Sequence, residues 1–177
     1  MVPMSEPASA VAGETESDVS GRSSFEELFS AEHHGLYGAL VLITRSSHEA
    51  EEVMQDAFLR VWERWDRVAA LDDPVGYLYR TAMNLFRSRR RRVLVALRRT
   101  VKPREPDDGL AEVEDREAVV RALAPLTPGQ RAAIVLVDVL GFTSEEAGRA
   151  LRVHPVTVRV LASRGRAALR KEMTERG

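Results

Sequence analysis

The stretch TSEEAGRALRVHPVTVRVLASRGRAALR, residues 143–170, indicates how the C-terminal part of this chain folds. Thr143 and Glu146 have the spacing of a capping box, so a short helix is expected to start here. A tight turn follows at residues 152–154, and Pro155 has the position that proline favours in the first turn of a helix. A helix, a short turn and a basic helix form the helix-turn-helix pattern, whose second helix enters the DNA major groove.

The second helix of this pattern has two distinct faces. On a helical wheel, its apolar stripe, expected to face the core, consists of Val158, Leu161, Ala162, Gly165 and Leu169. The opposite face carries Val156, Arg159, Val160, Ser163 and Ala167, with Arg164 and Arg170 on the flanks. Such a surface can contact thymine methyl groups while guanidinium groups reach guanine edges or phosphates. The alternative is an amphipathic surface helix whose arginines only extend into solvent.

The rest of the chain also has the pattern of helices. Further capping-box pairs are Ser24 with Glu27, Ser46 with Glu49 and Thr127 with Gln130, and prolines follow Asp73 and Thr127. Apolar residues recur at helical spacing behind these signals, including Val53, Ala57, Val61, Trp62 and Trp65 in one run. Residues 132–140 could form a strand by propensity, but the cap before them and the Leu140-Gly141 stop favour a helix. With no β-hairpin signal, the sequence predicts an all-α fold.

The distribution of charge predicts two domains. The formal net charge is -1, yet residues 87–104 hold nine basic residues and no acid, and the segment 105–117 is mainly acidic. We therefore expect two small helical domains, residues 23–98 and 117–172, joined by a flexible linker over residues 99–116. Residues 1–22, rich in Ser, Glu, Ala and Gly, are expected to be a disordered tail, and residues 173–177 a short second tail.

Several classes of function find no support in the sequence. The chain has no cysteine, no apolar run of bilayer length and no signal-peptide pattern at its start, which favours the cytoplasm. His33 and His34 are adjacent and cannot share one helical face as metal ligands. No glycine-rich phosphate loop or activated nucleophile is present. We therefore expect no enzyme activity, no catalytic residue, no metal and no cofactor.

Two long segments resemble the sigma-70 family, and within it the extracytoplasmic-function (ECF) sigma factors. SSHEAEEVMQDAFLRVWERW with DDPVGYLYRTAMNLFRSRRRR resembles their second conserved region, and the segment from Leu126 to Arg170 resembles their fourth. The resemblance implies a subunit that binds core RNA polymerase and directs promoter recognition, melting and transcription initiation. It also implies promoter DNA as a partner, as a −35 duplex and a melted −10 element, and an anti-sigma factor as a further candidate partner.

The resemblance also implies roles for individual residues. The set implied to bind core polymerase is Glu52, Gln55, Asp56, Leu59 and Arg60, whereas Phe58 and Trp62 are expected to pack. The set implied to bind the −10 element is Tyr77, Arg80, Asn84, Arg87, Arg89, Arg90 and Arg91, with a loop at residues 66–73 that would hold a flipped base. The set implied to bind the −35 element is Pro155, Thr157, Arg159, Val160, Ser163, Arg164, Arg166 and Arg170.

The chain departs from the family pattern at a few positions. Ser88 stands where an aspartate is usual, Val160 and Leu161 replace a Ser-Arg pair, and EAG from Glu146 replaces Glu-Ile-Ala. Two other interpretations stay open at this point. One is a conventional helix-turn-helix transcriptional regulator, and the other is a polymerase-binding protein that does not initiate transcription.

Overall fold

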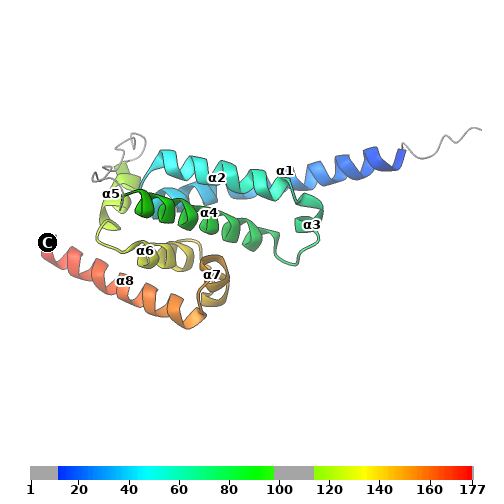
Figure 1. Cartoon of the computed structure of the whole chain (residues 1–177). Coiled ribbons are helices and arrows are strands. Elements are labelled where there is room, and N and C mark those ends of the chain that lie inside the picture. The colour runs from blue at the N-terminus through cyan, green and yellow to red at the C-terminus, as the bar shows by residue number, and fades with distance from the viewer. Residues whose placement is uncertain (1–11, 98–113, 177) are drawn as a thin grey trace, which may run out of the picture.

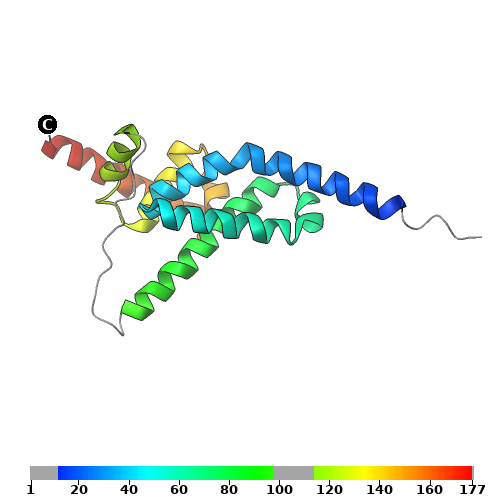
Figure 2. The same cartoon turned by 90° about the horizontal axis from the view of Figure 1, so that it is seen from above.

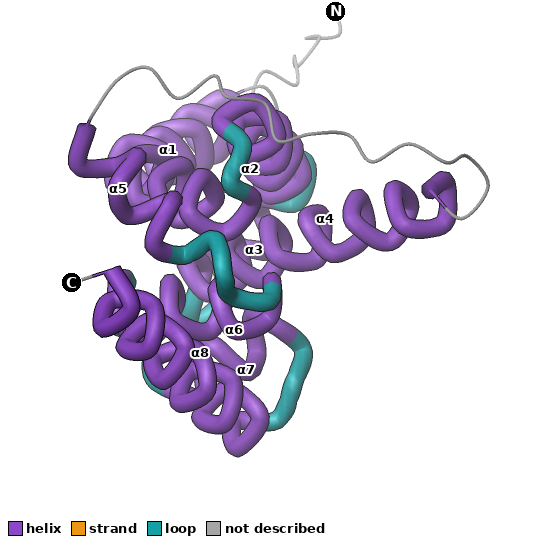
Figure 3. Tube along the Cα trace, turned by 90° about the vertical axis from the view of Figure 1, so that its left-hand side faces the viewer, coloured by secondary structure: helices purple, strands orange, loops and turns teal. Residues whose placement is uncertain are grey.

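A computed structural model describes residues 12–97 and 114–176, and the side chains of residues 21–95 and 118–174. The described residues are helices joined by short turns and include no strand, as the all-α prediction required (Figures 1 and 3). The predicted linker lies mostly outside the described residues, and α5 already begins within its last part, at Glu114.

The N-terminal half consists of α1 (Ala12–Thr44), α2 (Ser47–Trp62), α3 (Trp65–Ala69) and α4 (Pro74–Leu97). α2 packs on α1 and α4, and the chain reverses after α1 at Arg45, whose φ is 64°. The core between these helices is built from fully buried side chains: Leu36, Leu40, Ile43, Val53, Val61, Leu78 and Met83. The N-terminal part of α1 and the C-terminal part of α4 project from this bundle (Figures 1 and 2).

The C-terminal half consists of α5 (Glu114–Ala122), α6 (Pro128–Ile134), the π-helical segment η1 (Val135–Val139), α7 (Ser144–Leu151) and α8 (Pro155–Arg176). Residues 132–139 are therefore helical, as expected, and Leu140 follows as the cap. The π-helical geometry of residues 135–139 was not expected. Gly141 has a φ of 73°, a left-handed conformation that glycine adopts without steric cost, and it ends the helical run before α7.

Three of the four helix starts predicted from capping-box pairs are confirmed. The Ser46 side chain accepts a hydrogen bond from the Glu49 amide at 3.2 Å. Complete capping boxes join Thr127 to Gln130 and Thr143 to Glu146. Each of these caps satisfies amides that the first helical turn leaves without intrahelical partners.

The predicted helix start at Ser24 is wrong, and so is part of the predicted tail. α1 begins at Ala12, so residues 12–22 are helical and residues 1–11 lie outside the described residues. Ser24 lies inside this helix, where amides already have intrahelical partners. Its hydroxyl donates to the Gly21 carbonyl and accepts from Trp65 Nε1, both at 3.0 Å. Trp65 was expected to lie in the same helix as Val53 and Trp62, but it begins a separate helix, α3.

The two halves pack against each other. α7 lies against α4, and Figure 1 shows the α6–α8 layer directly beside α4. The ring of Tyr79 on α4 meets Phe142 edge-on at a centroid distance of 5.0 Å. Arg131 of α6, only 6% exposed, donates from Nε to the carbonyl oxygen of Ile43 at 2.7 Å. Burial lowers the pKa of Arg131 to about 10, and the neighbouring charge of Arg45 acts in the same direction.

Candidate functional site

The outer face of α2 carries the residues that the sequence assigned to polymerase binding. Val53, Ala57 and Val61 point into the core, so the residues on the opposite side of the helix face outward. Leu59 is 56% exposed, and Gln55 donates from Nε2 to Glu51 at 3.1 Å. The set comes together on this helix as Glu52, Gln55, Asp56, Leu59 and Arg60, of which Asp56 alone is half-buried.

An apolar groove of about 610 Å³ runs beside this face, between α1 and α2. Its lining is mainly aromatic and aliphatic, and consists of Phe25, Phe29, Met54, Phe58, Leu59 and Trp62 with the flanking Arg22, Glu26 and Gln55. Phe29 is 40% exposed and Trp62 38%, so neither is simply a core residue. Trp62 is among the residues predicted to pack, and Phe29 is absent from the predicted interface residues. The available signal was an apolar stripe on α1 too wide for one core-facing side.

The start of α4 lines a second depression. Asp73 accepts a hydrogen bond from the Gly76 amide at 2.7 Å, and the guanidinium of Arg80 lies 5.1 Å from the centre of the Tyr77 ring. A cavity of about 480 Å³ opens here, lined from the N-terminal half by Leu71, Asp72, Asp73, Val75, Gly76, Tyr77 and Arg80. Gly141, Phe142, Glu146 and Arg149 close its other side. The expected base-binding loop at residues 66–73 is in part helix, because α3 extends to Ala69.

The arginines of α4 do not lie on one surface. Arg87 donates to the carbonyl oxygen of Leu151 at the end of α7. Arg89 faces α2, where it pairs with Glu52 and Asp56. Arg90 and Arg91 are exposed, and Asn84 is half-buried. The structure thus brings Tyr77 and Arg80 together and directs Arg87 and Arg89 toward different neighbouring helices.

The helix-turn-helix is built as the sequence predicted. The backbone and side chain of Thr143 donate to the Glu146 carboxylate, which lowers its pKa. Arg152 ends α7 in the left-handed conformation, with a φ of 54°. Gly148 is required by close packing, since a Cβ there would lie 2.9 Å from the carbonyl oxygen of Val153. On α8, Val158, Ala162 and Gly165 are buried, as the helical wheel indicated.

The opposite face of α8 is open to solvent. Val156 is 50% exposed and Val160 41%, and the exposed polar and basic residues are Thr157, Arg159, Ser163, Arg164, Arg166 and Arg170, with Pro155 half-buried at the start. Arg166 makes two hydrogen bonds to Asp138 of η1, at 2.7 and 2.8 Å, and these raise its pKa. Arg166 is therefore oriented by η1, which sequence spacing alone did not indicate.

The described residues offer neither a membrane-spanning helix nor a metal-binding cluster. No helix among residues 12–97 and 114–176 has the length and apolar character to cross a bilayer. Within the same part of the chain, His, Asp and Glu side chains do not gather in threes around a point that could hold a metal ion.

Comparison with known proteins gives two matches to family models that together cover more than half of the chain. Sigma-70 region 2 matches residues 28–93, and Sigma-70, region 4 matches residues 116–169. ECF RNA polymerase sigma factor SigM of Mycobacterium tuberculosis is 32% identical over an alignment of 154 residues, which covers 84% of this chain and 76% of SigM. SigE of Mycolicibacterium smegmatis is 30% identical over 95% of this chain and 68% of its own length.

Two solved structures have a similar fold. The sigma factor RpoE, in complex with the anti-sigma factor NepR from Bartonella quintana, has a TM-score of 0.72 at 20% identity and covers 85% of this chain and 97% of its own. CnrH, in complex with the cytosolic domain of CnrY, has a TM-score of 0.64 at 22% identity and covers 88% and 91%. At these identities the two structures support the fold alone.

Proposed function

We propose a division of labour along this chain, which belongs to the sigma-70 family as an RNA polymerase sigma factor of the ECF type. The outer face of α2 binds core polymerase, the face of α4 that follows Tyr77 binds the melted −10 element, and α8 binds the −35 duplex. The same division makes the segment from 23 to 98 and the segment from 117 to 172 the two functional units.

The exposed face of α2 with the groove beside it is the observation that carries the polymerase assignment. Leu59 projects into solvent at the edge of an apolar groove that also exposes Phe29 and Trp62. Exposed aromatic and aliphatic side chains around a concave apolar surface are typical of binding hot spots. Phe29 and Trp62 therefore join Glu52, Gln55, Asp56, Leu59 and Arg60 in the proposed polymerase interface.

The DNA assignments rest on charge and exposure. Melted DNA offers phosphates and unstacked bases, which bind cations and aromatic rings. Tyr77 and Arg80 lie next to each other in the first turns of α4, where they line the cavity, and Asn84 and then the arginines follow along the helix. On α8, Val156 and Val160 suit contact with thymine methyl groups, and Arg159 and Arg164 suit guanine edges or phosphates.

The proposal extends to how the protein works in the cell. We assign it no catalytic step of its own, because its part in initiation is to bind and position, and we assign it to the cytoplasm, where polymerase acts. RpoE of Bartonella quintana is found in complex with an anti-sigma factor. By analogy, we propose that this chain too binds an anti-sigma partner, and that this partner holds the chain inactive.

In vitro transcription tests the function directly. The full chain is mixed with purified core polymerase and a pool of genomic promoter fragments, and specific run-off products are expected. A conventional helix-turn-helix regulator would bind DNA fragments without core-dependent initiation. A protein that only sequesters polymerase would bind the core and yield no product. Either of these two results would overturn the proposed function.

A further inference from the structure

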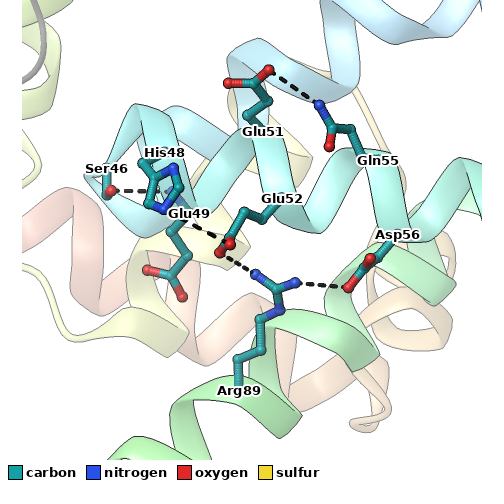
Figure 4. A network of polar contacts seen from close by, with 8 residues as sticks. All are labelled: Ser46, His48, Glu49, Glu51, Glu52, Gln55, Asp56 and Arg89. Atoms are coloured by element: carbon teal, nitrogen blue, oxygen red, sulfur yellow. Dashed lines mark hydrogen bonds and ion pairs between the residues drawn. The ribbon is translucent and has the colours of Figure 1, made fainter.

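Arg89 of α4 is held by two carboxylates of α2 (Figure 4). Its Nη1 donates to Glu52 Oε2 and its Nη2 donates to Asp56 Oδ2, both at 2.7 Å. Glu52 and Asp56 are four residues apart, so they lie one above the other on the same side of α2. The Arg89 side chain is 23% exposed, against 47% for Glu52 and 46% for Asp56. The side chains of Glu52 and Asp56 are therefore about twice as exposed as the side chain of Arg89.

One guanidinium faces two carboxylates in this cluster. Burial acts to lower the pKa of Arg89, but the hydrogen bond to Asp56 and the charges of Glu52 and Asp56 outweigh it and raise its pKa. Each terminal nitrogen of the guanidinium donates to a different carboxylate, a charge-assisted geometry that orders both helices relative to each other. In this state one N–H group of each terminal nitrogen of Arg89 is engaged by a protein oxygen.

The cluster of Arg89, Glu52 and Asp56 joins two surfaces for which different partners are proposed. Glu52 and Asp56 belong to the α2 face proposed for polymerase, and Arg89 belongs to the α4 set proposed for the −10 element. Its neighbours are in different situations, since Arg90 and Arg91 are exposed and Arg87 donates to α7. The side of α2 that faces Arg89 is acidic, because Glu49 carries a further carboxylate near Glu52, whereas Glu51 points away and accepts a hydrogen bond from Gln55. An interface of this sign favours a partner surface that carries cations.

We propose that Arg89 is a positioning residue whose contact with promoter phosphate depends on what occupies α2. In the free chain, Glu52 and Asp56 hold Arg89 against α2 and away from DNA. A cationic polymerase surface competes for these two carboxylates, and the Arg89 guanidinium then turns to a backbone phosphate of the melted strand. This inference rests on the proposed function. It adds that polymerase docking and −10 binding are coupled through one ion-pair cluster, and such coupling acts equally in both directions.

The salt dependence of DNA binding, measured with and without polymerase, tests the coupling. The slope of log affinity against log salt changes by about 0.7 for each phosphate of single-stranded DNA that a protein cation neutralises. Binding of the free full chain to a mixed-sequence single-stranded oligonucleotide is measured from low salt upward. Binding of the holoenzyme is measured on a promoter fork selected by run-off transcription. Arg89→Gln is compared with wild type in both, and in the free chain also in the background Glu52→Gln/Asp56→Asn.

In the free wild-type chain, Arg89→Gln should leave the salt slope unchanged. In the holoenzyme, and in the free Glu52→Gln/Asp56→Asn variant, Arg89→Gln should reduce the slope by about 0.7, the value of one neutralised phosphate. Glu51→Gln/Glu63→Gln is the matched control, because it removes two negative charges from α2 and its C-cap without changing either carboxylate that pairs with Arg89. In this control, Arg89→Gln should again have no effect on the slope of the free chain.

An equal slope change in the free wild-type chain and the holoenzyme would overturn the coupling, because Arg89 would then contact phosphate regardless of α2. No slope change in any state would also overturn it and leave Arg89 with a structural role. Helicity and thermal midpoint are recorded for every variant. Run-off transcription by the wild-type holoenzyme separates the two proposals, since its absence overturns the proposed function, while the free-chain comparison still decides whether the carboxylates restrain Arg89.

Discussion

The close packing of α6 against α8 leads to a prediction about Gly165. A Cβ at this position would lie 2.5 Å from Ile134 Cδ1, 3.2 Å from Ile134 Cγ1 and 3.4 Å from the Cβ of Gln130. Ile134 is itself 5% exposed, so it has little room to move. Overpacking of this kind costs about 1–3 kcal/mol, while alanine in place of glycine inside a helix contributes about 1 kcal/mol of stability. Gly165→Ala should therefore lower the free energy of unfolding by about 1 kcal/mol.

The same helix pair supplies the control. A Cβ at Gly129 would lie 3.6 and 3.7 Å from the two methyl carbons of Leu161, an ordinary contact distance. Gly129→Ala should raise the free energy of unfolding by about 0.4–1 kcal/mol. Urea denaturation of the full chain, followed by circular dichroism, measures both variants. In an Ile134→Val background, which lacks Cδ1, the cost of Gly165→Ala should largely disappear. If Gly165→Ala were as stabilising as Gly129→Ala, the close packing of α6 on α8 would be refuted.

Three further predictions concern the proposed interfaces and the predicted linker. Charge reversal at Asp56 combined with Leu59→Ala should weaken core-polymerase binding by about 2 kcal/mol or more without loss of helicity. Val139→Ala, which changes an equally exposed apolar residue elsewhere, should leave that binding unchanged, and unchanged affinity of the folded double variant would contradict the assignment. Arg159→Ala should cost about 1–3 kcal/mol of DNA-binding free energy and relax the sequence preference at one position of a randomised −35 library. Arg170→Ala should weaken binding to all sequences alike and reduce the slope of log affinity against log salt by about 0.9. Uniform losses from both variants would mean that α8 only positions the protein on DNA. Limited proteolysis should cut the segment predicted as linker and give fragments near residues 23–98 and 115–172. The two fragments should still co-elute, because α4 and α7 are in contact. A core that resists cleavage would contradict the predicted linker.

Local signals accounted for most of the helices and for the helix-turn-helix. The capping boxes at Thr127 and Thr143 involve residues three apart, so they can be recognised without knowing the fold. The buried stripe of α8 follows from helical periodicity, and Val158 and Ala162 are buried as expected. Ser24 shows where such signals fail, because a capping pair inside a longer helix has no unpaired first-turn amide to satisfy.

Contacts between distant parts of the chain could not be predicted in the same way. The pairing of Arg89 with Glu52 and of Arg166 with Asp138 joins residues on different helices, so it depends on how those helices dock. The same holds for Phe142, which packs against Tyr79 of the other half. Composition indicated a cluster of arginines near the end of α4, but only the packing of α2 and α7 decides which arginine faces which neighbour.

The two directions of Arg87 and Arg89 constrain how α4 can meet DNA. Arg87 and Arg89 are two positions apart, which corresponds to a rotation of about 200° around the helix axis, so they lie on nearly opposite sides of α4. One faces the end of α7 and the other faces α2. A single DNA strand following α4 cannot contact both while each keeps its present partner. If Arg87 turns to the −10 element, its hydrogen bond to the Leu151 carbonyl breaks, and α4 loses one of its contacts with α7. Because α7 and α8 form one helix-turn-helix, we expect a weaker contact between α4 and α7 to leave α8 freer to move, which would link the proposed binding of the −10 element by Arg87 to the proposed reading of the −35 element by α8.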